Sequence, residues 1–232
     1  MAFDFTKEYK DLYAPKTKPA LADVPPMGFI AVAGEGDPNE ENGSYAEALG
    51  LLYGLSFTIK MTKMGDWQPE GYFEYKVPPL EGLWWTDEGG FDGRRIVDKS
   101  AFRWISMIRQ PDFVTPETFA WAREKLSVKK PELDAGRARL VRFAEGPCAQ
   151  IMHRGPYDDE PATIAALSAF VAESGLVEDI ADPASAESLL DALDASGGAP
   201  GLRLHHELYL SDPRRAKPEN LRTVVRHPVR PA

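Results

Sequence analysis

Two stretches of this chain that lie 102 residues apart have related sequences. Residues Ile105–Glu117 (ISMIRQPDFVTPE) align without a gap on residues Glu207–Glu219 (ELYLSDPRRAKPE), so that both prolines and the final glutamate coincide. A fainter similarity, at an offset of 121 residues, places FIAVAGEGDPN over QIMHRGPYDDE. Repeats at this spacing are much longer than those of solenoid proteins. The pattern therefore predicts two related half-domains, and facing halves of this kind commonly enclose a cleft.

The expected elements divide the chain into a lead-in and two halves. Four prolines within residues 1–26 interrupt any long helix, so we expect an irregular lead-in there. Residues 27–130 and 131–232 each show the order strand, helix, strand, strand. In the first half, Ser44–Met61 carries apolar residues three and four positions apart, which is typical of an amphipathic helix. We therefore expect one integrated domain built from a duplicated β–α–β–β unit.

The composition excludes two classes of partner. The chain has 232 residues and a formal net charge of −9. A surface that binds nucleic acid must be basic, so we expect no direct contact with nucleic acid. No apolar run approaches the roughly 18 residues that a membrane span requires, and the first residues lack the apolar core of a signal peptide. Cys148 is the only cysteine, which excludes an intramolecular disulfide, and we expect a cytoplasmic protein.

The strand expected over LRLHHELYL has two chemically different faces. Alternate leucines mark its core face, whereas His205, Glu207 and Tyr209 share the other face. A glutamate in such a position is most often solvated, because unpaired carboxylates are rarely buried. A sharper hypothesis comes from the repeat, which aligns Glu207 with the apolar Ile105. The same alignment places Tyr209 over Met107. A carboxylate among aromatic rings attracts organic cations and can activate water as a general base.

Aromatic side chains are the candidate walls of a binding site. Most aromatic residues in a domain of this size form plain core, and this remains the alternative for each of them. Trp84 and Trp85 are adjacent on an expected strand and must face opposite ways, so at least one leaves the main core. We select Trp85 and Trp104 as candidate ligand-binding residues. Tyr53 and Phe57, four positions apart on the first helix, form a second candidate pair.

A third candidate, Tyr157, follows a turn at Gly155 and Pro156 at the end of an expected strand. A tyrosine there either packs on the next helix or points into the cleft, and the pattern does not decide between these alternatives. The segment GEGDPN lacks the third glycine of a dinucleotide-binding loop. The four histidines lack metal-ligand spacing. We therefore predict neither a metal nor a cofactor.

Four segments together resemble the GyrI-like family of small-molecule-binding domains, also called the SbmC or effector-binding family. They are YKVPPLEGLWW, GPYDDEP, HHELYLSDPRR and PENLRTVVRHPV, and the likeness covers about residues 20–230. The resemblance implies an α+β fold with antiparallel sheets, in which two β–α–β–β modules related by a pseudo-twofold axis enclose a cleft for aromatic or cationic molecules. It also places Glu207 where drug-sensing members have a strand glutamate. Those regulators carry a helix-turn-helix domain where this chain has its proline-rich lead-in.

The chain also resembles a stand-alone subfamily that hydrolyses cyclopropane-bearing, DNA-alkylating toxins with a cage of aromatic side chains. The tryptophan-rich segment PLEGLWW favours this subfamily. The resemblance implies that Glu207 attracts positive charge or positions a water molecule, with Tyr157 as its catalytic partner. The remaining aromatic candidates would contact the ligand, and these are Trp85, Trp104, Tyr53, Phe57 and Tyr209.

Two alternatives to an enzyme remain open. The first is a non-catalytic module that sequesters a ligand or contacts a partner protein such as a topoisomerase. The second is a sensor that works with a separate DNA-binding chain. The sequence determines neither the natural ligand nor the oligomeric state.

Overall fold

The structure is a computed structural model that describes residues 2–86, 97–181, 185–195 and 203–232. The elements of the first part of the chain are α1 (Phe5–Glu8), α2 (Lys10–Tyr13), β1 (Ala20–Val24), β2 (Met27–Glu35), α3 (Ser44–Lys60), β3 (Leu80–Thr86), β4 (Phe102–Arg109) and α4 (Pro116–Lys129). The later elements are β5 (Arg139–Phe143), β6 (Gly146–Arg154), α5 (Glu160–Glu173), β7 (Leu176–Glu178), α6 (Ala186–Ala195), β8 (His205–Tyr209) and β9 (Arg222–Pro231). Helices and antiparallel strands together make this an α+β fold, as the sequence predicted.

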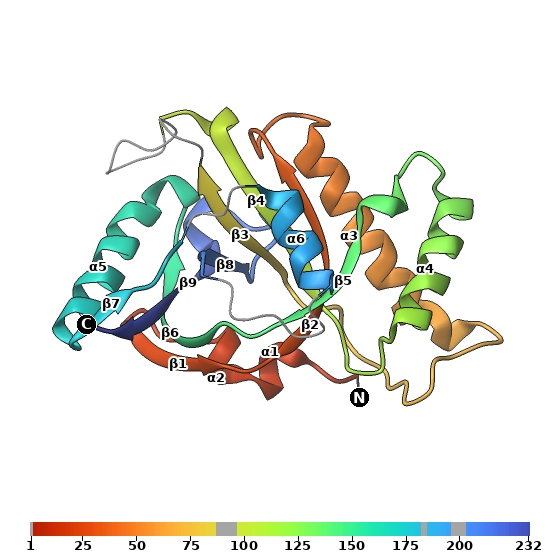
Figure 1. Cartoon of the computed structure of the whole chain (residues 1–232), viewed down its shortest axis with the longest axis horizontal. Coiled ribbons are helices and arrows are strands. Elements are labelled where there is room, and N and C mark those ends of the chain that lie inside the picture. Colours follow the sequence, from red (N-terminus) through yellow and green to blue (C-terminus); the bar gives the residue numbers. More distant parts are fainter. Residues whose placement is uncertain (1, 87–96, 182–184, 196–202) are drawn as a thin grey trace.

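Within the described residues, nine strands form one continuous sheet (Figure 1). Eight of them follow the order β1-β6-β9-β8-β3-β4-β2-β5, and β7 pairs with the end of β9. The two halves of the chain meet in the middle of the sheet, where β8 pairs with β3. The sheet therefore connects both halves into one structural unit.

The strand order is symmetric about the junction of β3 and β8. On one side lie β3, β4 and β2, and on the other lie β8, β9 and β6 in the matching positions, which is compatible with a duplication. The alignment at an offset of 102 does not follow this symmetry, because it superimposes β4 on β8, whereas the counterpart of β4 is β9. Ile105 is therefore not the structural equivalent of Glu207. The residue directly across the junction from Glu207 is Gly82.

The lead-in is more ordered than its prolines predict. It contains α1, α2 and β1, and β1 pairs with β6 along its whole length. The prolines lie between these elements and not inside them, which is where proline is tolerated. The expected first strand of GYFEYKVPPLEGLWW is not formed, and Tyr75 makes only an isolated bridge with Phe3.

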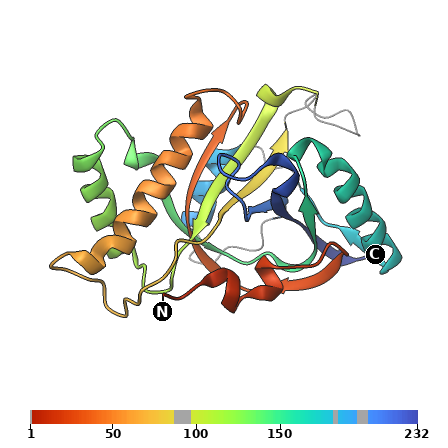
Figure 2. The same cartoon turned by 180° about the vertical axis from the view of Figure 1, so that it is seen from behind.

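Helices cover the sheet in a way that leaves its centre accessible. The helix α3 packs on β2 and β4, and α5 packs on β6 and β7, so the two helices flank β3 and β8 on one face (Figures 1 and 2). The opposite face is covered by α6, which packs on β5, β2 and β4. No helix in the described ranges is long and apolar enough to cross a membrane.

The helix α3 has two apolar faces with different roles. One face is buried against the sheet and consists of Ala48, Leu51, Leu52, Leu55 and Ile59. Tyr45, Leu49 and Tyr53 form a second, half-buried row, one residue per turn, that packs at the edge of this core and lines the cleft. The helix thus fills the core and forms one wall of a cleft.

Candidate functional site

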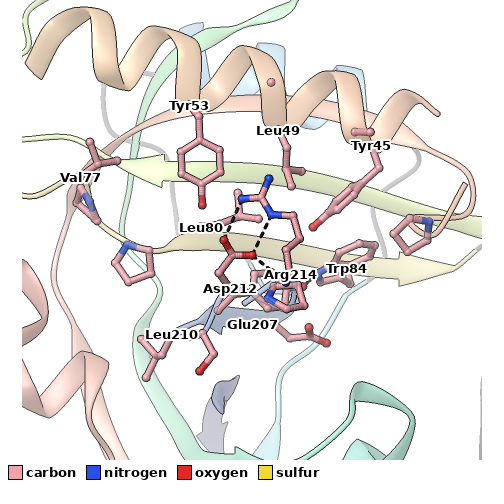
Figure 3. A pocket seen from close by; sticks show the side chains of 18 of the residues that line it. Tyr45, Leu49, Tyr53, Val77, Leu80, Trp84, Glu207, Leu210, Asp212 and Arg214 are labelled. Atoms are coloured by element: carbon pink, nitrogen blue, oxygen red, sulfur yellow. Dashed lines mark hydrogen bonds and ion pairs between the residues drawn. The ribbon is translucent and has the colours of Figure 1, made fainter. Parts of the chain in front are cut away.

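A cleft of about 2800 Å³ lies above β3 and β8, between α3 and α5. Figure 3 shows Tyr45, Leu49 and Tyr53 projecting into it from α3, above a floor to which Leu80, Trp84 and Glu207 contribute. The wall formed by α5 includes Glu160, Ile164 and Ser168. Pockets for drug-sized ligands usually have volumes of roughly 300–1,000 Å³, so the whole cleft is larger than one such ligand requires. It continues along α3 to a second region beside Trp67 and Trp121.

Glu207 lies in the floor of this cleft. The alternation along β8 is as expected. His206 and Leu208 are buried on one face, whereas His205, Glu207 and Tyr209 line the cleft on the other. The side chain of Glu207 is 13% exposed. Its Oε1 lies 2.8 Å from Nε2 of His205. Because Gly82 across the junction has no side chain, the space in front of this carboxylate is available to other groups.

Glu160, the first residue of α5, faces Glu207 from the opposite wall, and the two carboxyl groups are hydrogen-bonded. Burial, together with repulsion by Glu207, raises the pKa of Glu160 to about 10. Burial also opposes ionisation of Glu207, but hydrogen bonds to His205, Tyr209 and Glu160 outweigh it and lower the pKa of Glu207. At neutral pH the pair therefore holds one proton, on Glu160, and one negative charge, on Glu207.

Two phenols and an indole surround this charge. Nε1 of Trp84 donates a 2.7 Å hydrogen bond to the hydroxyl of Tyr209, which is itself hydrogen-bonded to Glu207. Tyr45 packs on Trp84 with ring centroids 5.5 Å apart and is also hydrogen-bonded to Tyr209. Burial and the charge of Glu207 raise the pKa of both phenols, so they remain neutral donors. Gly82 is needed here, because a Cβ atom would lie 2.4 Å from Nε1 of Trp84.

Tyr157 lies at the rim of the cleft in the turn before α5 and is 37% exposed. Its ring meets that of Tyr209 edge-on, with centroids 5.8 Å apart. The turn is fixed by Gly155, whose φ of 127° suits only glycine, and by His153, whose Nε2 lies 3.0 Å from the carbonyl oxygen of Pro156. Burial and neighbouring carboxylates raise the pKa of Tyr157 to about 12.

The three tryptophans of the central strands have different positions. Trp84 faces the cleft, because the register pairs it with His205. Trp85 contributes to the cleft lining, but alternation along β3 directs its side chain toward the other face. Trp104, which was also selected as a ligand-binding residue, is fully buried and is not among the residues that line the cleft. It lies behind Tyr45, which it meets edge-on at a centroid distance of 5.1 Å, and so supports the wall.

Tyr53 and Phe57 line the cleft further along α3. Their rings are tilted with centroids 6.4 Å apart, and Phe57 is 47% exposed. Below Tyr53, the carboxylate of Asp212 accepts hydrogen bonds of 2.9 and 3.0 Å from Arg214 (Figure 3). The structure therefore brings Glu207, Tyr209 and Tyr157 together and places the Tyr53–Phe57 pair beside them on a separate wall.

Several cleft residues were not selected from the sequence. Tyr45 belongs to a row with Leu49 and Tyr53, and this spacing of four was a usable signal. Glu160 lies within the segment GPYDDEP, but nothing in the local pattern indicates that it meets Glu207. His227 lines the cleft from β9, which no motif indicated.

A second cluster of acids and a histidine lies on the other face of β8 and is closed to solvent. His206 lies 3.2 Å from Glu81 and 2.9 Å from Glu145. Arg226 contacts Glu145 at 3.0 Å and donates a 2.8 Å hydrogen bond to the carbonyl oxygen of Leu12 in α2. Burial opposes the charge of Glu145, but His206 and Arg226 lower its pKa to about 2. This cluster fastens the lead-in to the sheet.

Polar side chains near Glu207 are hydrogen-bonded to one another in pairs and chains. Across the described ranges, no three histidine, cysteine, aspartate or glutamate side chains are grouped so that they could hold a metal ion.

A mixed helix–sheet fold with an aromatic cleft around one ionised carboxylate defines a small-molecule-binding domain. Residues 17–192 match the GyrI-like small molecule binding domain. The chain belongs to this GyrI-like family.

Solved structures from Listeria innocua are similar over nearly the whole chain. One hydrolase is 42% identical with a TM-score of 0.80, and the match covers 98% of this chain and 100% of that one. A second hydrolase is 43% identical with a TM-score of 0.81, over 99% of this chain and 100% of the other. An uncharacterized conserved protein is 45% identical with a TM-score of 0.82, and the match covers 98% of this chain and 100% of that protein. Among proteins of curated function, none matches this chain significantly.

Proposed function

We propose that this protein binds small aromatic or cationic xenobiotics in the cleft and hydrolyses those that carry a strained, electrophilic cyclopropane ring. The observation that carries the proposal is the position of Glu207 in the floor of a cleft, beside aromatic side chains and opposite the buried Glu160. Glu160 is neutral and Glu207 is ionised, and the latter lies within a largely aromatic enclosure. A single desolvated carboxylate of this kind both attracts a cation and serves as a general base.

Binding would use the aromatic rows on both sides of Glu207. Tyr45 and Trp84 lie against each other at its end of the cleft, and Tyr53 extends the wall along α3. Rings of this kind stack on planar ligands and attract cations, with contributions of about 0.5–2 kcal/mol for each cation–π contact. Tyr157 and Tyr209, both neutral, can donate hydrogen bonds to a ligand oxygen.

In the hydrolytic step, Glu207 removes a proton from a water molecule as the water oxygen forms a bond to the strained ring carbon. The carbon–carbon bond of the ring breaks, and its electron pair moves into a carbonyl group conjugated with the ring. Tyr157 donates a hydrogen bond to that oxygen at the rim, where solvent supplies the proton. The net result is the addition of one water molecule. Glu160 cannot replace Glu207 as the base, because it is already protonated.

Two similar Listeria innocua structures are of proteins described as hydrolases, which supports a catalytic role. The family description speaks only of small-molecule binding, and this favours the second candidate function, non-catalytic sequestration of the same ligands. Turnover distinguishes the two.

The test uses the purified protein at one-twentieth of the concentration of a cyclopropanoid alkylator, with ring-opened product followed by mass spectrometry. We expect several equivalents of product, little from Glu207→Gln, and near-normal amounts from Glu160→Gln, whose neutral amide resembles the protonated acid. Glu219→Gln, on the exposed surface, is the control. Product at or below one equivalent with intact binding would leave sequestration as the function.

A further inference from the structure

A line of four hydrogen-bonded side chains leads from Glu207 across the cleft face of the sheet to a second carboxylate. Glu207 Oε1 lies 2.8 Å from Nε2 of His205, and Nδ1 of His205 lies 2.7 Å from Nε2 of His227. Nδ1 of His227 lies 2.8 Å from Oε1 of Glu178. Ser168 donates a 2.9 Å hydrogen bond to the same Glu178 oxygen. Each ring nitrogen of both histidines therefore has one partner at hydrogen-bond distance.

Neighbouring strands create this line. His205 and His227 face each other across β8 and β9, one position beyond the register pair of His206 with Arg226. Glu178 is at the end of β7, which pairs with β9. Exposure rises from His227, with 4% of its side chain accessible, to Glu178, with 28%. The line thus connects the cleft floor with a more accessible carboxylate.

The number of protons in this line follows from its three contacts. Each contact needs exactly one proton between its two heavy atoms. Two neutral imidazoles supply only two N–H groups, so one contact would oppose two lone pairs. Two imidazolium ions supply four N–H groups. Nδ1 of His205 and Nε2 of His227 would then each carry a proton, and the two N–H groups would point at each other across 2.7 Å. Three protons fit, which corresponds to one imidazole and one imidazolium.

We propose that His205 and His227 share a single excess proton and act as a charge relay between Glu207 and Glu178. With the charge on His205, the imidazolium lies against Glu207. When the proton between the rings moves from Nδ1 of His205 to Nε2 of His227, the charge moves toward Glu178. Both arrangements satisfy all three contacts, and no heavy atom has to move.

The surrounding charges agree with this assignment. The ionisable groups acting on His227 are Glu178, His205 and Glu207. Burial, only partly offset by the hydrogen bond to Glu178, lowers the pKa of His227. At the cleft end, Glu160 and Tyr209 also contact Glu207, and both are neutral. Glu178 is ionised, because its hydrogen bond to His227 lowers its pKa.

The relay would let Glu207 be stabilised in the empty cleft and still interact with a ligand cation or accept a proton. While the cleft is empty, the imidazolium of His205 stabilises the buried carboxylate. A ligand cation beside Glu207 would repel this imidazolium, and the charge can then move to His227. The same shift follows when Glu207 takes a proton from water, and this consequence rests on the proposed function. His205, His227 and Glu178 are therefore positioning residues for Glu207.

The proton count is tested without ligand or turnover, by long-range ¹H–¹⁵N NMR of the folded protein labelled on histidine. The variants His205→Gln and His227→Gln assign the signals. We expect three N–H groups on the pair at neutral pH and no second protonation near the ordinary histidine pKa of about 6.5. Two N–H groups at neutral pH, or two independent titrations near that pH, would overturn the proposal. Because no ligand is present, this result is independent of whether the protein hydrolyses anything.

The coupling between the two ends is tested with Glu178→Gln, which preserves an acceptor for His227 but removes the charge. Loss of that charge makes the excess proton less stable, so Glu207 should be harder to ionise. The affinity for a cationic dye falls at low pH, and we expect the midpoint of this fall to lie at a higher pH in the variant. At pH values well above the midpoint, the affinity should be unchanged. Glu173→Gln, at the exposed end of α5, is the matched control and should not move it. An unchanged pH profile in Glu178→Gln would refute the coupling.

Discussion

Two clusters of acids and histidines lie on opposite faces of the same short strand, β8. On the cleft face, His205 contacts Glu207, and side-chain exposures of 19% and 13% leave both groups accessible. On the back face, His206 lies between Glu81 and Glu145, and all three are closed to solvent. The residue types are nearly the same, yet one cluster faces an open cleft and the other fastens the lead-in to the sheet.

The difference between them is the balance of charge. The back cluster contains Arg226, which compensates Glu145 and satisfies a carbonyl of α2. Among the described residues, the hydrogen-bond partners of Glu207 include no arginine, and the second carboxyl group of the cleft cluster, that of Glu160, is protonated. A buried cluster that is closed to solvent and paired with an arginine stabilises the fold, whereas a carboxylate that faces an open cleft and is paired with a histidine remains accessible to a ligand.

The largest expected effect is the loss of the back cluster. Arg226→Met would leave the buried Glu145 without one of its two cationic partners, and removal of one member of a buried ion pair costs about 3–5 kcal/mol. We expect urea denaturation to show a fall of this size in the free energy of unfolding. Arg222→Met, on the same strand but exposed, should change it little. Equal effects of the two variants would show that the back cluster does not fasten the fold.

The next effect concerns affinity and leaves the fold intact. Glu207→Gln removes the one negative charge of the carboxyl pair, so we expect the dissociation constant of a fluorescent cationic dye to rise about tenfold or more, equivalent to at least 1.4 kcal/mol. The midpoint of urea denaturation should fall much less than in Arg226→Met. Unchanged dye affinity would remove Glu207 from the binding site.

Glu160 should make the free energy of unfolding depend on pH. Folding raises the pKa of Glu160 from 4.5 to about 10, so the folded protein holds a proton that the unfolded chain releases. The contribution of this group to stability is therefore fully present below pH 4.5 and is lost as the pH rises toward 10. Glu160→Gln does not titrate, so its stability relative to the wild type should increase with pH. Urea midpoints across this range measure the difference, and a constant difference would contradict the raised pKa.

The smallest effects distinguish the tryptophans. Trp84→Phe removes the donor to Tyr209, and loss of one hydrogen bond of about 0.5–1.5 kcal/mol should weaken dye binding several-fold. Trp104→Phe should lower thermal stability and leave the dye affinity nearly unchanged, because this side chain lies behind Tyr45. The reverse pattern would mean that the cleft wall has been assigned to the wrong tryptophan.

The sequence predicts the fold class and the two faces of β8, because alternation along a strand is a local property. It does not predict which strands are equivalent. The alignment at an offset of 102 placed β4 over β8, whereas the symmetry of the strand order makes β9 the counterpart of β4. The position of Trp104 behind the cleft wall was not predicted either. Whether a strand residue is covered depends on the helix packed above it, which here presents Tyr45.

The charge state of the cleft was equally beyond local patterns. Glu160 and Glu207 are far apart in the chain and meet only because α5 begins opposite β8. The same holds for His205 and His227, which become neighbours through strand pairing. Contacts of this kind arise from the tertiary fold, and a single sequence contains no direct signal for them.

The most direct test is a crystal structure of the protein with a cationic aromatic ligand. We expect the ligand between α3 and α5, with its charged or electrophilic atom about 3–4 Å from the carboxylate of Glu207 and its ring against Tyr45 or Trp84. A ligand bound only in the distant part of the groove, beside Trp67 and Trp121, with nothing at Glu207, would contradict the account.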